Sequence, residues 1–154
     1  DKGFTYGART SFEFRRRPGP FSLQVSVQTS ATKAAIQESL DEIDAIRGRR
    51  PVTPGELALG VAGLTRGYPR GFETAEQLAR ALTQLALYDL PDDHFATFVP
   101  RIEAVTPSEV TRVAGIHLQP SKLVTLVVGD PDRIGTDIGS LGLGTPVVLP
   151  AADQ

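Results

Sequence analysis

Two segments near the start of the chain alternate apolar and polar residues, and this pattern constrains the fold more than any other. The first covers residues 4–14 and the second covers residues 21–27. Alternate positions of a strand point to one face of its sheet, so each segment predicts a strand with one apolar side. The turn signal Arg17-Pro18-Gly19-Pro20 separates them, and together they predict a β-hairpin over residues 4–28 with one buried face. The positions that share this face are Phe4, Tyr6, Ala8, Thr10, Phe12 and Phe14, then Phe21, Leu23, Val25 and Val27.

The period of the apolar residues changes after the hairpin, and residues 31–118 have helical spacing. Gly48 is expected to end the first helix, and Pro100 is expected to kink or split the fourth. Helix starts are marked by capping boxes, in which a threonine is followed three positions later by Glu or Gln. The capping pairs are Thr53 with Glu56, Thr74 with Gln77, and Thr106 with Glu109.

A last apolar run, residues 123–128, ends at Gly129-Asp130 and predicts a strand that is covered on both faces. The order of hairpin, helices and strand predicts an α+β fold of two layers, with helices packed on one face of a mostly antiparallel sheet. Three strands are few for so many helices, and the chain opens directly into a strand without methionine. We therefore expect a domain over residues 1–150 that is incomplete at its N-terminus, and a tail at residues 151–154.

Composition excludes several classes of function. The 154 residues are 40% hydrophobic and 22% charged, as in an ordinary soluble globular protein. The net charge of −2 provides no general attraction for nucleic acid or for an anionic membrane. Cysteine is absent, which excludes disulfides and thiolate chemistry, and no apolar run approaches the ~20 residues that span a bilayer. The compartment, cytoplasmic or exported, is not determined by these features.

The sequence offers no recognisable metal site. His94 and His117 are the only histidines, and no His-x-x-Glu-His sequence accompanies them. Zinc sites in proteins use three or four ligands at recognisable spacings. Ordinary surface or helix-end histidines are therefore favoured, and we expect neither a metal ligand nor a catalytic residue in this chain.

Two further segments have a plain structural interpretation and a functional alternative. Arg15-Arg16-Arg17 is the densest basic cluster, and a solvated hairpin tip is favoured over an edge that contacts a substrate or partner. Residues 129–132 and 139–144 are rich in glycine but lack the spacing of a phosphate-binding loop. They are interpreted as the end of a strand and a loop.

A set of short sequences, in a fixed order over residues 1–150, resembles the pitrilysin/insulinase-like zinc peptidases and the mitochondrial processing peptidases. Each is weak alone, but their order and separations make the resemblance specific. They are Lys2-Gly3-Phe4-Thr5-Tyr6-Gly7-Ala8-Arg9, Gln28-Thr29, Pro51-Val52-Thr53-Pro54-Gly55-Glu56-Leu57, Tyr68-Pro69, Phe72-Glu73-Thr74, Leu87-Tyr88-Asp89-Leu90-Pro91, Val105-Thr106 and Val127-Val128-Gly129-Asp130.

The resemblance implies a particular half of such an enzyme. In this family two homologous α+β halves enclose a chamber, and the N-terminal half carries the zinc motif. The C-terminal half contributes an arginine and a tyrosine that hold the substrate, and Tyr6 matches this tyrosine, while the matching arginine would lie upstream of Asp1. From the residues alone, Tyr6 is a strand aromatic that fills the sheet's buried face. The resemblance implies instead a substrate-facing phenol.

The resemblance thus implies the substrate-binding, chamber-closing half of a bacterial-type zinc metalloendopeptidase, inactive by itself. Zinc and the catalytic motif are expected in an N-terminal half or in a partner subunit, and a peptide is the expected substrate. The alternative is a non-catalytic structural or partner subunit of the same family. An unpaired sheet edge also predicts self-association into a homo-oligomer.

Overall fold

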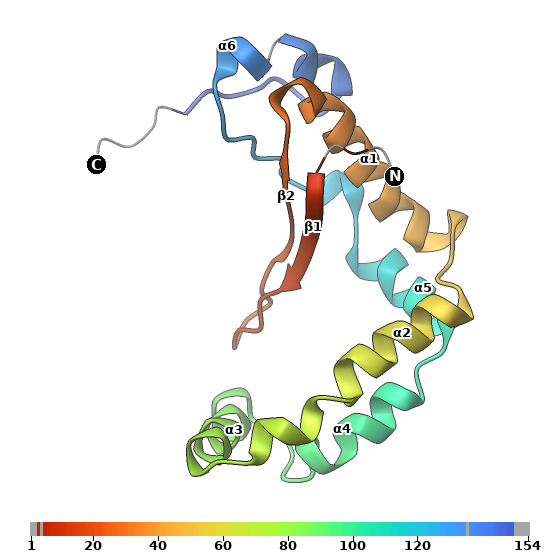
Figure 1. Ribbon diagram of the computed structural model, residues 1–154, viewed down its shortest axis with the longest axis vertical. Coiled ribbons are helices and arrows are strands. Elements are labelled where there is room, and N and C mark those ends of the chain that lie inside the picture. The colour runs from red at the N-terminus through yellow and green to blue at the C-terminus, as the bar shows by residue number, and fades with distance from the viewer. Residues whose placement is uncertain (1–2, 4, 135, 150–154) are drawn as a thin grey trace.

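The chain is an α+β protein in which one antiparallel hairpin is followed by a series of helices (Figure 1). The computed structural model describes residues 3, 5–134 and 136–149, without the side chains of Tyr6, Thr136 and Asp137. The strands are β1 (Thr5–Phe12) and β2 (Phe21–Val27). The helices are α1 (Thr32–Asp44), α2 (Pro54–Thr65), α3 (Ala75–Tyr88), α4 (His94–Glu103), α5 (Pro107–His117) and α6 (Pro131–Ile134), with a π-helical turn, η2 (Ala45–Arg49), directly after α1.

The predicted hairpin is confirmed, but its register contains an irregularity that the sequence pattern did not indicate. Ala8 pairs with Val25 and Thr5 pairs with Val27, so β1 has one more residue than β2 between these pairs. Such a β-bulge shifts the alternation of faces by one position. The strict alternation predicted for the first strand is therefore interrupted at the bulge, because Thr5 lies opposite Val27 and Ala8 lies opposite Val25.

The burial predicted for the hairpin is only partly observed. Residues 21, 23, 25 and 27 of β2 are half-buried, whereas β1 is exposed along its described side chains. Phe12 contacts Phe21 with ring centroids 5.0 Å apart and still exposes 59% of its surface. A face with this pattern needs a further covering layer to become a core.

All three predicted capping boxes are present. At the start of α5, the Thr106 hydroxyl accepts from the Glu109 N–H at 3.3 Å, and the Glu109 carboxylate accepts from the Thr106 N–H at 2.9 Å. α2 and α3 begin with the same reciprocal bonds. The Thr106 hydroxyl also donates to the Glu109 carboxylate at 2.9 Å, and this bond, together with the bond from the Thr106 N–H, lowers the pKa of Glu109 by stabilising its ionised form.

Of the two predicted helix breakers, the glycine ends its helix and the proline does not. Gly48 lies in η2 with a backbone outside the helical region (φ 158°, ψ −26°), so it ends the first helix as predicted. Pro100 lies inside α4, which continues from His94 to Glu103, so the predicted split is wrong. Asp89, with φ 52°, ends α3 in the left-handed conformation, and its N–H donates to the carbonyl of Leu85.

The fully buried residues gather where α1 and η2 meet the rest of the chain. They include Ala45, which is 3% exposed, and Ala114 of α5, which is 6% exposed. A Cβ on Gly115 would come within 3.9 Å of the Arg47 carbonyl oxygen, so small side chains let α5 approach η2 closely. None of the described large side chains is fully buried.

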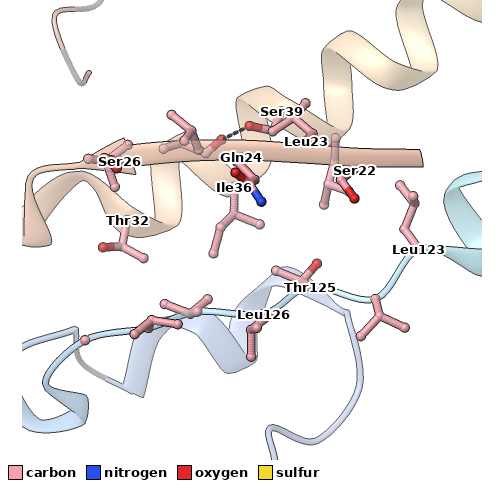
Figure 2. Close-up of a pocket in the computed structure, with 18 of the residues that line it drawn as sticks. Ser22, Leu23, Gln24, Ser26, Thr32, Ile36, Ser39, Leu123, Thr125 and Leu126 are labelled. Atoms are coloured by element: carbon pink, nitrogen blue, oxygen red, sulfur yellow. Dashed lines mark hydrogen bonds between the residues drawn. The ribbon is translucent and has the colours of Figure 1, made fainter. Parts of the chain in front are cut away.

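Residues 123–128 do not form the predicted third strand. The segment is extended, but among the described residues only β1 and β2 form a ladder. A strand requires a partner for its backbone hydrogen bonds, and the edge of β2 that faces this segment is separated from it by open space (Figure 2). The tail at residues 151–154 lies outside the described residues.

The chain is open rather than compact, with the helices arranged as an arc beside the hairpin (Figure 1). Its accessible surface is 12306 Å², whereas a compact protein of 16.5 kDa exposes about 7,500 Å². Exposed apolar residues include Val124 at 92% and Val128 at 89%. Such surface is typical of a chain whose folded faces are completed by other polypeptide.

We expect Thr106→Ala to destabilise α5 by about 1 kcal/mol, because the N-cap acceptor for the Glu109 N–H is lost. Thr106→Ser keeps the hydroxyl, and its free energy of unfolding should stay within a few tenths of a kcal/mol, roughly, of the value for the original chain. The measurement is the midpoint of urea unfolding followed by far-ultraviolet circular dichroism. Equal midpoints for the alanine and serine variants would contradict the cap.

Candidate functional site

The main concave feature is a slot between β2 and the extended residues 123–128, with a volume of about 710 Å³. β2 forms one wall, residues 123–129 form the opposite wall, and α1 closes one side. Figure 2 shows Gln24 on β2 and Thr125 on the opposite segment on either side of this space. Ile36, Leu40 and Ile43 of α1 line the same space. We call this feature the β2 slot.

The β2 slot is lined without a single charged side chain. Its polar lining consists of hydroxyl and amide groups, such as those of Ser22, Gln24 and Thr125, and the remainder is apolar. The Ser39 hydroxyl is already satisfied, since it donates to the Ala35 carbonyl at 2.7 Å. Among the described lining residues, no acidic, basic or imidazole side chain accompanies these hydroxyl groups, and the lining suits an apolar segment.

Both walls of the β2 slot present free backbone edges. The Glu13 N–H donates to the Pro20 carbonyl at 3.1 Å, and in an antiparallel pair these bonds recur at every second residue. By this alternation Ser22 and Gln24 bond to β1, while the N–H and C=O groups of Leu23 and Val25 point away from β1. On the opposite wall, residues 124–128 form none of the described backbone hydrogen bonds.

Tyr6, the predicted substrate-binding residue, lies at the bulge of β1, between the paired residues Thr5 and Ala8. Its side chain is outside the described part of the structure, so its substrate-facing role stays a prediction. The neighbouring Gly7 N–H donates to the Thr5 hydroxyl at 3.1 Å, which fixes the local backbone of the bulge. Bulges are enriched next to active sites, where they redirect a side chain.

The two histidines lie at helix ends on different elements. His94 is the first residue of α4 and His117 the last residue of α5. His94 contacts Phe95, with ring centroids 5.2 Å apart. Among the described residues, no three His, Asp or Glu side chains gather closely enough to hold a metal ion.

The basic cluster lies at the hairpin tip, as expected. The Arg15 guanidinium donates from Nε to the Glu13 carboxylate at 3.0 Å, so this arginine is paired with a neighbour on its own strand end. Arg16 and Arg17 are exposed. The exposed ion pair between Arg15 and Glu13 contributes little to the stability of the fold.

The glycine-rich segment after residue 128 is a turn that starts a short helix. The Asp130 carboxylate accepts from the Asp132 N–H at 3.0 Å and thereby caps α6. A Cβ on Gly129 would lie 2.8 Å from Cδ1 of Ile134, so close packing accounts for this glycine. Residues 129–132 therefore end the extended segment and begin α6, whereas part of residues 139–144, predicted to be a loop, lies in the 3₁₀ helix η5 (Thr136–Leu141).

An aromatic cluster connects the turn after α2 to α4. Tyr68 stacks on Phe98, with ring centroids 4.3 Å apart and planes inclined by 12°, and Phe72 lies edge-on to both Tyr68 and Phe95. Burial raises the pKa of Tyr68. The cluster packs one turn against one helix, and we assign it a structural role.

Sequence reasoning missed the β2 slot, because it placed residues 123–128 within the sheet. The signal was nevertheless present, since an uncharged run with apolar residues on both faces requires cover on both sides. In the structure Leu126 is 75% exposed, so this requirement is not met by the described residues.

None of the helices among the described residues has the length and apolar character of a membrane span.

The fold matches a solved structure described as the inactive domain of peptidase M16 from Pseudomonas fluorescens, with a TM-score of 0.69 and 18% sequence identity. The match covers 77% of this chain and 28% of that chain, so this chain spans a minor part of the solved protein's length. No protein-family model matches the sequence, and no curated protein matches it. At this identity the likeness shows a shared α+β fold, that of an M16 inactive domain.

We expect the phenol of Tyr68 to ionise at a higher pH than an ordinary tyrosine, since burial disfavours the phenolate and raises its pKa. A pKa raised in the folded state gives stability that is complete below the unfolded tyrosine pKa of about 10 and is lost as pH rises through the folded value. Absorbance titration near 295 nm should show a late phase that Tyr68→Phe removes and Tyr88→Phe keeps. A late phase that survives Tyr68→Phe would contradict the assignment.

Proposed function

We propose that this chain is the substrate-binding, chamber-closing half of a zinc metallopeptidase and is inactive without a zinc-bearing half. The observation that carries the proposal is the fold. Over 77% of this chain, it matches an M16 peptidase domain that is described as inactive. The resemblance of the sequence to pitrilysin-like peptidases supports it independently. The reaction of the complete enzyme is the hydrolysis of a peptide bond, and a bacterial source fits the matched protein.

Zinc in this proposal belongs to an N-terminal half or a partner subunit. The sequence contains two histidines and no His-x-x-Glu-His motif, so the donor set that catalytic zinc uses in these enzymes does not fit this chain. Bound in that other half, zinc would supply an activated water. The part of this chain is to close the chamber and to hold the peptide.

Tyr6 is the proposed contact with the substrate. Its position at the bulge of β1 supports this role, because a bulge redirects the side chains that it contains. A phenolic hydroxyl can donate a hydrogen bond to the oxygen that becomes negative in the transition state. The Thr5–Gly7 contact holds the backbone on either side of Tyr6.

The two-layer arrangement is also part of the proposal. In the complete domain the helices cover one face of a larger sheet, and the half-buried residues of β2 become part of its core. The contact between α1 and the β2 slot supports this arrangement, since Ile36, Leu40 and Ile43 already face the slot. The opposite face of the sheet then remains for the chamber.

The second candidate is a non-catalytic structural or partner subunit of the same family. The description of the matched domain as inactive favours this reading as much as the first. The two candidate functions differ in one respect. In the first, a zinc-bearing half that is bound to this chain hydrolyses peptides, and in the second no such hydrolysis takes place.

We expect Tyr6→Phe, made in the full-length polypeptide with its zinc-bearing half, to lower kcat by about 100-fold, the size seen when one oxyanion donor is removed. Tyr88→Phe is the matched control, because the Tyr88 hydroxyl donates to the Phe14 carbonyl at 3.0 Å, away from the bulge. The measurement is hydrolysis of a fluorogenic peptide. Unchanged kcat/KM in Tyr6→Phe would remove the proposed role, and no activity in any preparation would favour the second candidate.

A further inference from the structure

The two walls of the β2 slot are strand edges that lack partners among the described residues. On one side, the backbone N–H and C=O groups of Leu23 and Val25, which line the slot, point away from β1 and have no described partner. On the other side, residues 124–128 are extended and form none of the described backbone hydrogen bonds. Free edges of this kind are templates for β-strand addition, in which the main chain provides the affinity. The slot thus presents two such templates to one occupant.

The lining fixes the chemistry of this occupant. None of the described lining residues is charged, and Leu23, Ile36 and Leu126 are among its apolar members (Figure 2). A charged segment would lose its hydration here without gaining an ion pair. The occupant is therefore an uncharged, apolar extended segment, and a volume of about 710 Å³ suits a few residues of one strand rather than a folded domain.

The hairpin of a second copy of the chain does not meet this requirement. A strand inside the slot needs two free edges, whereas β1 and β2 are already paired with each other. Among the described residues of another copy, the segments 124–128 and 144–149 lie outside the strands and form none of the described backbone hydrogen bonds. A second copy could therefore enter only with one of these segments.

The exposed area favours a permanent partner. The chain exposes 12306 Å², roughly 4,800 Å² more than a compact protein of its mass. Standard interfaces bury a total of about 1,200–2,000 Å², and only obligate associations reach several thousand. The solved M16 protein extends far beyond the matched region, since the match covers 28% of its chain.

We propose that one apolar strand, contributed by the M16-like polypeptide outside these 154 residues, inserts between β2 and residues 123–128 and pairs with both. This rests on the proposed function only in taking the chain to be part of a larger M16-like protein. The inserted strand turns the hairpin and residues 123–128 into a continuous four-stranded sheet with α1 on one face. It also covers the apolar edges that the isolated chain exposes.

Introduced cysteines test the order of the strands, because the chain has none of its own. In the full-length polypeptide, Gln24→Cys is combined first with Thr125→Cys and then with Leu126→Cys. Both partners are used because Thr125 and Leu126 are neighbours in an extended segment and point to opposite faces. Strands on either side of an inserted strand lie about 10 Å apart, beyond the ~7 Å between Cα atoms that a disulfide spans. We expect neither pair to form a disulfide, while Ser11→Cys with Ser22→Cys, which are direct partners, forms one.

Amide hydrogen exchange tests whether the edges are paired. In the full-length polypeptide, the amides of Leu23 and Val25 should exchange about 100-fold more slowly than in the isolated 154-residue chain. The amide of Gln24 bonds to β1 in both and serves as the internal control. Exchange at Leu23 and Val25 that is equally fast in both proteins would overturn the proposal.

Two other outcomes also overturn it. A disulfide between Gln24→Cys and either partner, formed as readily as in the control, would mean that residues 123–128 pair directly with β2. Protection that rises with protein concentration, together with a dimer in sedimentation, would identify a second copy as the occupant. Neither measurement depends on peptidase activity, so protected edges in an inactive protein would retain the inserted strand and remove only the proposed function.

Discussion

The contact between η2 and α5 is the constraint on which the rest of the structure depends. Ala45 and Ala114 are among the few buried residues, and a Cβ on Gly115 would be in ordinary contact, at 3.9 Å, with the Arg47 carbonyl oxygen. Small side chains let the two backbones approach, so dispersion contacts replace a large apolar core. The hairpin with α1 lies on one side of this contact, and α2 to α4 lie on the other (Figure 1). Arg47 bonds to Asp44 at 2.7 Å beside the same contact.

The local features of the fold could be predicted because they depend on neighbours in sequence. A threonine followed three positions later by glutamate or glutamine is sufficient for a cap, and Thr53, Thr74 and Thr106 all form theirs. Proline was a weaker guide, since α4 accommodates Pro100 in its last turns. The bulge at Tyr6 could not be predicted, because it appears only when the two strands are brought into register.

The β2 slot could not be predicted for a related reason. The composition of residues 123–128 correctly indicated a segment that needs cover on both faces, but it carries no information on which neighbour supplies the cover. Whether the segment becomes a strand depends on chain that is distant in sequence. For the same reason, the role of Tyr6 in substrate binding is inferred from a family resemblance. The separate positions of His94 and His117, by contrast, follow from the helices that contain them.

The uncharged segment at residues 123–128 also has a consequence for how the protein is made. Leu-Val-Thr-Leu-Val-Val is a six-residue run of high β-propensity without charge, proline or glycine, which is the composition of segments that form cross-β fibrils. A ribosome that adds about 5–20 residues per second completes β2 some 5–20 s before it completes this run. During that interval the edge of β2 is open to other nascent chains. The order of synthesis therefore makes early capture of this edge, by a strand or by a chaperone, a condition for soluble protein.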